Sequence, residues 1–389
     1  MSSKLFVNYL MQISFQSRFN MQGLFIASTG QHIGKTTACL GLFSGLDKLF
    51  SHLGYMKPIG QQHIITKQGI QVDKDVLVFK KYFGLTDSLE SMSPILIPSG
   101  FTRDFLDKKI HIDDLRKKII SSFKIIQENK QLVLVEGTGH CGVGSIIHLN
   151  NAQVAKELKL PLVLISSGGL GSSFDDLMLN ITLCDQYKLS ILGVILNRVL
   201  PEKQEMIQHY MRKALKRWNL PLLGCIPFDP FLSTFSMGDF ELLFRTSIIT
   251  GSNYRFRHFD RIRLVATSVE SYREMILPNQ LIITPSNRED IILATLNKHL
   301  ELLDIHKEGL CAGMILTGDF APRHYLIEQL AKADIPVLYT PLHSYTAMQK
   351  ISAFTAKIST EDIDKIKEAI SIAESHIDFS LLQSALNGS

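Results

Sequence analysis

A glycine-rich segment that ends in Gly34-Lys35-Thr36 contains the residue types that bind phosphate. A short apolar run precedes it, and small and apolar residues from Ala38 to Leu49 follow it, which we expect to form a helix. In such a strand–loop–helix unit, backbone N–H groups and the positive end of the helix converge on an anion. Lys35 would reach the β- and γ-phosphates, and the Thr36 hydroxyl would hold Mg²⁺. The predicted nucleotide-binding residues here are Thr29, Gly30, Ile33, Gly34, Lys35, Thr36 and Thr37.

One position departs from the strict pattern of a phosphate-binding loop. The pattern asks for glycine at position 29, where this chain has Thr29, and Gly30 comes one place later. The alternative is a glycine turn that merely precedes an exposed lysine. Because the Gly-Lys-Thr core and its flanking elements are intact, the sequence favours phosphate binding.

The composition is typical of a large globular protein. The chain has 389 residues, of which 45% are hydrophobic and 20% charged, so it is long enough for two domains. The 41 basic and 37 acidic residues give a net charge of +4. This charge is too mild to indicate nucleic acid as a partner, although it is compatible with anionic small molecules.

Cysteine spacing and hydropathy predict a cytoplasmic protein. The five cysteines are scattered without paired spacing, which argues against a disulfide framework or a zinc site and favours a reducing compartment. Residues 1–20 form an N-terminal extension whose apolar part is too short to cross a bilayer and lacks a cleavage site. No other run approaches transmembrane length, so we expect no membrane partner.

Apolar runs alternate with helical segments through the first part of the chain. Near-continuous apolar strands of this kind indicate a parallel sheet that is covered on both faces. Polar residues and glycines follow the strand ends, where open α/β sheets bind their ligands. The predicted strands are 23–27, 54–59, 131–135, 161–165, 191–196 and 222–226.

The pattern changes beyond Phe231 and then resumes as a second, smaller alternation. We expect strands at 264–268, 281–284, 313–317 and 336–339, and helices near 288–304, 322–333, 344–354 and 361–376. The fold class is therefore α/β with two domains. The predicted division is an extension at 1–20, a nucleotide-binding domain at 21–231, a connection at 232–262 and a second domain at 263–380.

Four segments together resemble the dethiobiotin synthetase-like P-loop family. They are Gly34-Lys35-Thr36-Thr37, Lys57-Pro58, Val135-Glu136-Gly137-Thr138-Gly139 and Gly193-Val194-Ile195-Leu196-Asn197-Arg198. The stretches at 136–145 and 168–176 resemble more closely the region that precedes the catalytic domain in long bacterial phosphotransacetylases. The second domain resembles a DRTGG domain through 282–290 and Ile315-Leu316-Thr317-Gly318, with Asp319 where a second glycine is frequent. The resemblance covers about residues 22–378, so we expect the transacetylase domain to be absent.

The resemblance implies a metal role for one or two carboxylates. Glu136 follows a buried strand on the phosphate side, where a carboxylate can hold Mg²⁺ directly or through water. The alternative for Glu136 is a helix-cap or loop acid. A second metal-side acid is implied near Asp73 and Asp75, and Asp75 is the residue we assign. Asp75 has an equal alternative as the N-cap of the helix that follows it.

The resemblance also implies roles for a second lysine and an asparagine. Lys57 resembles the lysine near the transferring phosphate, so we expect Lys35 and Lys57 to be catalytic cations; its alternative is a solvated lysine at a strand end. Asn197 matches the position that reads the purine edge, because a carboxamide both donates and accepts. GTP-binding proteins often have an aspartate where this chain has Leu200, so adenine is preferred.

The leading functional prediction is a protein that binds MgATP and slowly hydrolyses or transfers its γ-phosphate. The second domain would regulate or oligomerise it, and we expect a homo-oligomer. One alternative is an ATP-dependent ligase of the dethiobiotin synthetase or cobyrinic acid amide synthase type, whose partner would be a small carboxylate metabolite. Another is a non-catalytic nucleotide sensor or scaffold. The basic and aromatic run at 254–263 is more typical of an edge strand or linker than of a nucleic-acid site.

Overall fold

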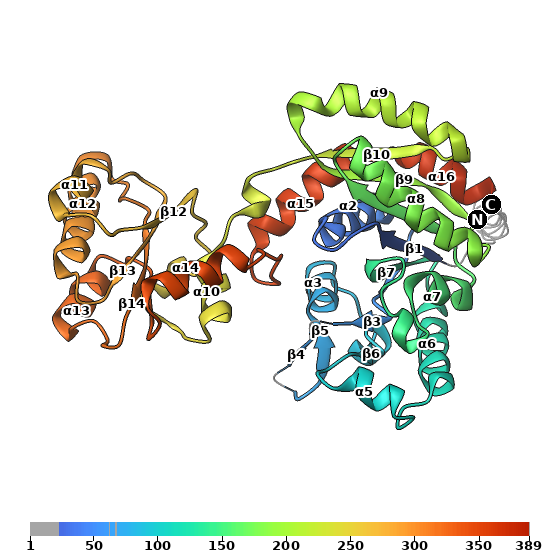
Figure 1. Ribbon diagram of the computed structural model, residues 1–389, viewed down its shortest axis with the longest axis horizontal. Coiled ribbons are helices and arrows are strands. Elements are labelled where there is room, and N and C mark those ends of the chain that lie inside the picture. The colour runs from blue at the N-terminus through green and yellow to red at the C-terminus, as the bar shows by residue number, and fades with distance from the viewer. Residues whose placement is uncertain (1–22, 62, 67, 389) are drawn as a thin grey trace, which may run out of the picture. The chain divides into compact units, whose positions relative to one another are not determined.

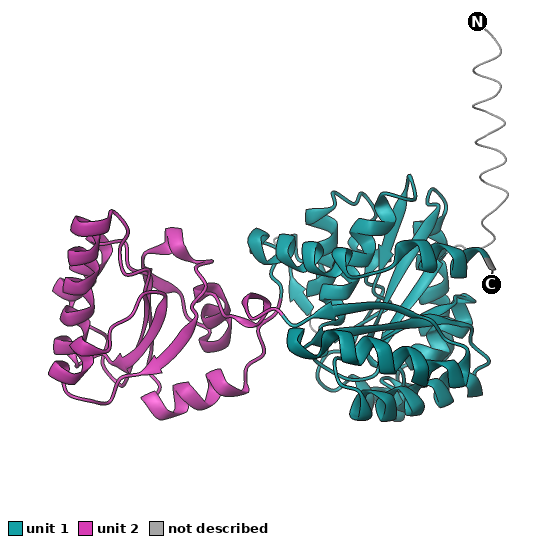
Figure 2. Ribbon diagram, turned by 90° about the horizontal axis from the view of Figure 1, so that it is seen from above, with its two compact units in different colours: residues 1–228, 358–389 teal, residues 229–357 magenta. Residues whose placement is uncertain are grey.

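Residues 23–61, 63–66 and 68–388 are described by the computed structural model of the chain (Figure 1). The chain divides into two units, which Figure 2 colours separately. Unit 1 combines the chain up to Phe228 with the segment from Ile358 onward, and unit 2 is Asp229–Lys357. Unit 2 is thus inserted into unit 1 along the sequence.

A six-stranded sheet in the order β10-β9-β8-β1-β7-β2 forms the centre of unit 1, and all its neighbouring strands run parallel. Every residue of β1 is buried. Because successive side chains point to opposite faces of a sheet, both faces must be covered. This confirms the predicted parallel α/β fold. The strands are β1 (Gly23–Ser28), β2 (Leu53–Met56), β7 (Leu132–His140), β8 (Leu162–Ser167), β9 (Ile191–Val199) and β10 (Leu222–Pro227).

Helices and two small strand pairs complete unit 1. The pairs are β3 (Ile59–Gly60) with β6 (Ile95–Leu96), and β4 (His63–Ile65) with β5 (Gln71–Asp73). The helices are α2 (Lys35–Asp47), α3 (Lys74–Tyr82), α4 (Leu89–Met92), α5 (Phe101–Leu106), α6 (Ile112–Gln127), α7 (Asn151–Leu158), α8 (Gly171–Gln186), α9 (Gln204–Leu215), α15 (Ile363–Ser375) and α16 (Phe379–Gly388).

The two C-terminal helices pack closely on α2 through glycines. A methyl group added at Gly41 would lie 2.4 Å from the Cβ of Ala373 on α15, and one at Gly45 would lie 2.0 Å from the ring of Phe379 on α16. Ser44 Oγ donates to Glu374 Oε2 at 2.8 Å at the same contact. The helix that starts at the glycine-rich loop is therefore covered by the last helices of the chain.

Unit 2 contains a five-stranded sheet in the order β11-β15-β14-β13-β12, in which only β11 pairs antiparallel. Alternate residues of β13 enter two different apolar clusters: Ile282 in one, Leu281 and Ile283 in the other. The two clusters therefore lie on opposite faces of the sheet. Its strands are β11 (Ile248–Thr250), β12 (Arg261–Leu264), β13 (Gln280–Pro285), β14 (Gly313–Thr317) and β15 (Val337–Thr340). Its helices are α10 (Met237–Phe244), α11 (Val269–Glu274), α12 (Glu289–His306), α13 (His324–Lys332) and α14 (Ser344–Ala353).

The structure differs from the sequence-based expectation between residues 232 and 268. The expected connection at 232–262 contains α10 and β11, because Met237, Phe240 and Phe259 are buried in one of the clusters of unit 2. The first strand of the parallel set lies at Arg261–Leu264 rather than at 264–268. It is an edge strand, and it contains only the last three residues of the basic and aromatic run at 254–263, for which an edge strand or a linker was expected.

The predicted second domain ran to residue 380, whereas α15 and α16 belong to unit 1. The physical reason is burial: Ile366, Ala369, Leu382 and Leu386 bring apolar faces that unit 1 covers. Among the described residues, the helices are too short or too polar to cross a membrane. The extension at residues 1–20 lies outside the described residues.

Candidate functional site

The glycine-rich loop connects the end of β1 to the first residue of α2. Gly34 immediately precedes α2 and has a left-handed backbone with φ +78°, which glycine adopts without strain. The first turn of α2 contains no acidic residue and receives no side-chain cap. Within the described part of the chain, the backbone N–H groups of residues 34–37 have no acceptor. The loop therefore presents unsatisfied donors at a helix N-terminus, as an anion site requires.

Lys35 and Thr36 both reach across to β7. The Lys35 ammonium donates to the carbonyl of Gly139 at 3.1 Å, and Thr36 Oγ1 donates to Glu136 Oε1 at 3.3 Å. Ser28 Oγ also donates to the Gly139 carbonyl, at 2.7 Å. Burial lowers the pKa of Lys35, and the nearby charge of Glu136 opposes that shift. The structure thus brings together the lysine, the hydroxyl and the acid that the sequence predicted separately.

Glu136 lies within β7 and is 1% exposed, which contradicts its alternative as a helix-cap or loop acid. Tyr55 on β2 donates its hydroxyl to Glu136 Oε2 at 2.8 Å. The Tyr55 ring stacks on Phe79 with a centroid distance of 3.7 Å, so its position is fixed by packing. Burial raises the pKa of Glu136, although the charge of Lys57 opposes the shift. Sequence reasoning missed Tyr55; the available signal was its position two residues before Lys57, on the same side of an extended strand.

Lys57 is 7% exposed and lies among three carboxylates, which contradicts its alternative as a solvated lysine. Its ammonium lies 3.1 Å from Asp73 Oδ1 and 4.0 Å from Glu136 Oε1, and it also pairs directly with Asp75 Oδ2. Burial lowers the pKa of Lys57, but the charges of Asp75, Glu136 and Asp73 together raise it above its ordinary value. Lys57 is therefore held as a cation inside the site.

Asp73, not Asp75, is the N-cap of α3. Asp73 Oδ1 accepts from the Asp75 backbone N–H at 3.0 Å, and Asp73 has extended backbone angles as N-caps do. The second oxygen of Asp73 is buried without a partner among the described residues. Asp75 lies in the first turn of α3 and is less buried than Asp73. The alternative in which Asp75 is the N-cap of this helix is therefore wrong.

The described residues contain no group of three or more histidine, cysteine or acidic side chains placed to hold a metal ion by themselves. Thr36, Asp75 and Glu136 nevertheless offer oxygen donors beside a phosphate-type loop. Mg²⁺ prefers such oxygens and keeps several waters, with substrate phosphates completing its shell. The buried oxygen of Asp73 that has no partner among the described residues is consistent with a cation at this place. So is the charge balance, because three carboxylates face only the two ammonium groups of Lys35 and Lys57.

Asn197, near the end of β9, is 2% exposed and contacts the loop itself. Its amide nitrogen donates to the carbonyls of Ile33 at 2.8 Å and Gly34 at 2.9 Å, while its oxygen accepts from the Arg198 backbone N–H at 2.9 Å. Both amide hydrogens are thus engaged by the loop. Leu200, three residues later, is 41% exposed.

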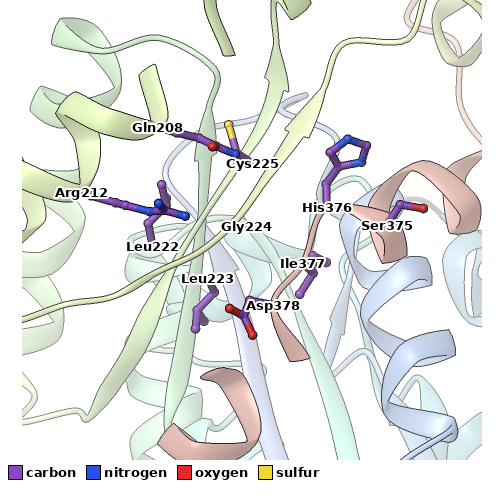
Figure 3. Close-up of a pocket in the computed structure, with 10 residues that line it drawn as sticks. All are labelled: Gln208, Arg212, Leu222, Leu223, Gly224, Cys225, Ser375, His376, Ile377 and Asp378. Carbon is purple, nitrogen blue, oxygen red and sulfur yellow. The ribbon is translucent and has the colours of Figure 1, made fainter. Parts of the chain in front are cut away.

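A cavity of about 280 Å³ lies elsewhere in unit 1, between α9, β10 and the segment that joins α15 to α16 (Figure 3). Burial raises the pKa of Cys225, which borders it, to about 11. None of the sequence-predicted site residues borders this cavity. Its polar lining consists of Gln208, Arg212, Cys225, Ser375, His376 and Asp378.

Two known protein families match successive parts of this chain. The AAA domain family matches residues 22–235, and the DRTGG domain family matches residues 244–354. A phosphate acetyltransferase from Pseudomonas aeruginosa is 27% identical over 93% of this chain and 52% of its own length. This chain therefore spans about half the length of such relatives.

Two further comparisons each cover slightly more than half of this chain. An ATP-dependent dethiobiotin synthetase from Nitrosopumilus maritimus is 27% identical over 56% of this chain and 93% of its own length. Among solved structures, the MinC:MinD cell division protein complex of Aquifex aeolicus aligns with 54% of this chain and 82% of its own, at 18% identity and a TM-score of 0.35.

Proposed function

The chain belongs to the AAA domain family through residues 22–235, and from this premise we propose that it binds MgATP and slowly hydrolyses or transfers the γ-phosphate. Its DRTGG domain regulates that activity or mediates homo-oligomer formation in the cytoplasm. The observation that carries the proposal is the meeting of Lys35, Thr36, Glu136 and Lys57 beside a loop with unsatisfied N–H donors.

Each residue has a role that its chemistry supports. The loop N–H groups and Lys35 bind the β- and γ-phosphates, while Thr36, Glu136 and Asp75 hold Mg²⁺ directly or through water. Lys57 stabilises negative charge on the transferring group, because a fixed cation in a buried site acts strongly on developing charge. Bound Mg²⁺ supplies charge neutralisation to the phosphates.

Calorimetric titration with MgATP tests this proposal. Wild type is expected to bind, and Lys35→Ala is expected to lose binding while it keeps its thermal unfolding transition. Lys117→Ala, on an exposed face of α6, is the matched control and is expected to bind as wild type does. Absence of MgATP binding by wild type would contradict the proposed function.

A second candidate is an ATP-dependent ligase that activates a small carboxylate metabolite. It is supported by the dethiobiotin synthetase similarity, which covers 93% of that relative, and by the buried Lys57 cation. This candidate predicts that ATP hydrolysis stays near zero until a particular acid is added. A screen of metabolite acids separates it from the first candidate, for which hydrolysis is independent of any acid.

The non-catalytic sensor remains a third hypothesis because Thr29 replaces the first glycine of the strict loop pattern. A single-turnover assay distinguishes it from both enzymes. Tight binding of MgATP without product over hours would select the sensor. Because several relatives are phosphate acetyltransferases, small carboxylates are the metabolites to screen first.

A further inference from the structure

Asn197 and Arg198 hold the outer side of the glycine-rich loop. Asn197 donates to the carbonyls of Ile33 and Gly34, and Arg198 Nη1 donates to the carbonyl of His32 at 2.9 Å. Three successive carbonyl groups of the loop therefore point toward the end of β9. Arg198 itself has φ +59°, an unusual conformation for a residue other than glycine.

This orientation fixes the direction of the N–H groups on the inner side of the loop. In a planar trans peptide, the carbonyl of one residue and the N–H of the next point in opposite directions. The N–H groups of residues 33–35 consequently point away from β9. The sheet order places β8 and β1 between β9 and β7, the strand that contains Glu136 and Gly139.

The loop backbone lies directly on the Asn197 amide. A methyl group added at Gly34 would lie 2.4 Å from Asn197 Nδ2, which is closer than any side chain tolerates. Gly34 is thus required by this contact as well as by its positive φ. With both amide hydrogens on the loop and 2% exposure, Asn197 has no donor left for a base.

We propose that Asn197 is a positioning residue that, together with Arg198, preorganises the loop for a triphosphate of any base, rather than a reader of the purine edge. This inference rests on the proposed nucleotide site and names what orders it. Preorganisation of donors lowers the cost of ordering the loop at the moment of binding. The role therefore concerns the phosphate chain, and base selectivity is left to other residues.

The test compares MgATP, MgGTP and Mg-tripolyphosphate as titrants of the full chain. Asn197→Ala is expected to weaken all three by the same factor, about tenfold, which is the effect of losing two hydrogen bonds. The ratio of ATP to GTP affinity stays unchanged. Asn150→Ala is the matched control, because Asn150 is also buried and caps α7 through backbone bonds without contacting the loop. It is expected to lower thermal stability without changing any affinity.

Each other outcome overturns the inference. If Asn197→Ala loses ATP affinity but keeps tripolyphosphate affinity, Asn197 reads the base and the proposed function stands. If Asn197→Ala changes nothing, or if Asn150→Ala weakens all ligands equally, the loop is not ordered by this contact. Failure of wild type to bind either ATP or tripolyphosphate would instead contradict the proposed function itself.

Discussion

Lys57 balances three carboxylates that are largely withdrawn from water. Removing one partner of a buried ion pair leaves uncompensated charge and costs about 3–5 kcal/mol. We expect Lys57→Met to lower the free energy of unfolding at neutral pH by about that amount. The deficit should shrink as pH falls, because protonation of the acids removes the repulsion.

Urea unfolding at two pH values measures this effect. Lys109→Met is the control, because Lys109 makes exposed ion pairs with Asp104 and Asp107 that contribute only about 0–1 kcal/mol. An equal deficit for Lys57→Met at both pH values would assign the loss to packing instead of charge.

The pKa of Glu136 predicts how Mg²⁺ binding depends on pH. Burial raises this pKa above the ordinary value of 4.5, and Mg²⁺ binds the ionised form. Affinity for Mg²⁺ in the presence of ATP should therefore fall as pH falls, beginning above the usual carboxylate range, with protons released on binding. Titration in buffers of different ionisation enthalpy measures the release. Because ATP itself also loses a proton when it binds Mg²⁺, Glu136→Gln should release fewer protons than wild type, whereas Glu128→Gln should release as many; equal release by Glu136→Gln and wild type would assign the additional proton elsewhere.

Motif spacing predicted the residues that converge, because Lys35 and Thr36 follow β1 and Glu136 lies in the adjacent strand β7. The position of Tyr55 two residues before Lys57 could have indicated the side of the strand on which it lies, but not its partner Glu136, because that hydrogen bond crosses between β2 and β7. The Asn197 contact was equally hidden, since a carboxamide near a strand end fits either a base or a backbone.

Among the elements, the contact of α2 with the C-terminal helices depends on the absence of side chains at two positions. A methyl group at Gly45 would enter the ring of Phe379. Overpacking of this kind costs about 1–3 kcal/mol, so Gly45→Ala should lower the free energy of unfolding by that amount. Denaturant unfolding of unit 1 measures the loss.

Gly171→Ala is the control, because nothing lies within 4 Å of a methyl group there. It should not destabilise the protein. The double variant Gly45→Ala with Phe379→Ala tests the mechanism: the two losses should not add, because the second change removes the clash. Simple additivity would mean that the ring is not the obstacle.

Strong apolar runs predicted most strands, since a strand buried on both faces needs a continuous apolar sequence. The short elements α10 and β11 were missed for the opposite reason. Each element is short, and each is buried by contacts with residues outside itself. Met237 and Phe240 of α10 lie in the same cluster as Phe259, and β11 pairs with β15.

In the whole molecule, unit 2 is expected to fold without unit 1, whereas unit 1 needs its C-terminal segment. Unit 2 has a sheet with an apolar cluster on each face, so residues 229–357 should fold in isolation. A chain that ends at residue 357 should keep the unfolding transition of unit 2 and lose the cooperative transition of unit 1. Calorimetry of the full chain and both fragments checks this. Two intact transitions in the shortened chain would show that α15 and α16 are dispensable.

The insertion of unit 2 into unit 1 could not be predicted from the sequence. The periodicity of residues 363–375 shows that they are helical, but not which sheet the helix covers. An element that follows a domain along the chain is naturally assigned to it. The contacts of α15 and α16 with the glycines of α2, and the hydrogen bond between Ser44 and Glu374, show that these helices belong to unit 1.

The insertion of unit 2 also determines the order in which the parts of unit 1 are synthesised. The glycine face of α2 is made early, yet its cover at residues 358–388 emerges only after the inserted unit has been translated. Translation of that insert takes on the order of ten seconds. Throughout this interval the nascent first unit exposes an apolar helix face to chaperones and to neighbouring polysome chains. Unit 1 can consequently complete its fold only after unit 2 has been synthesised.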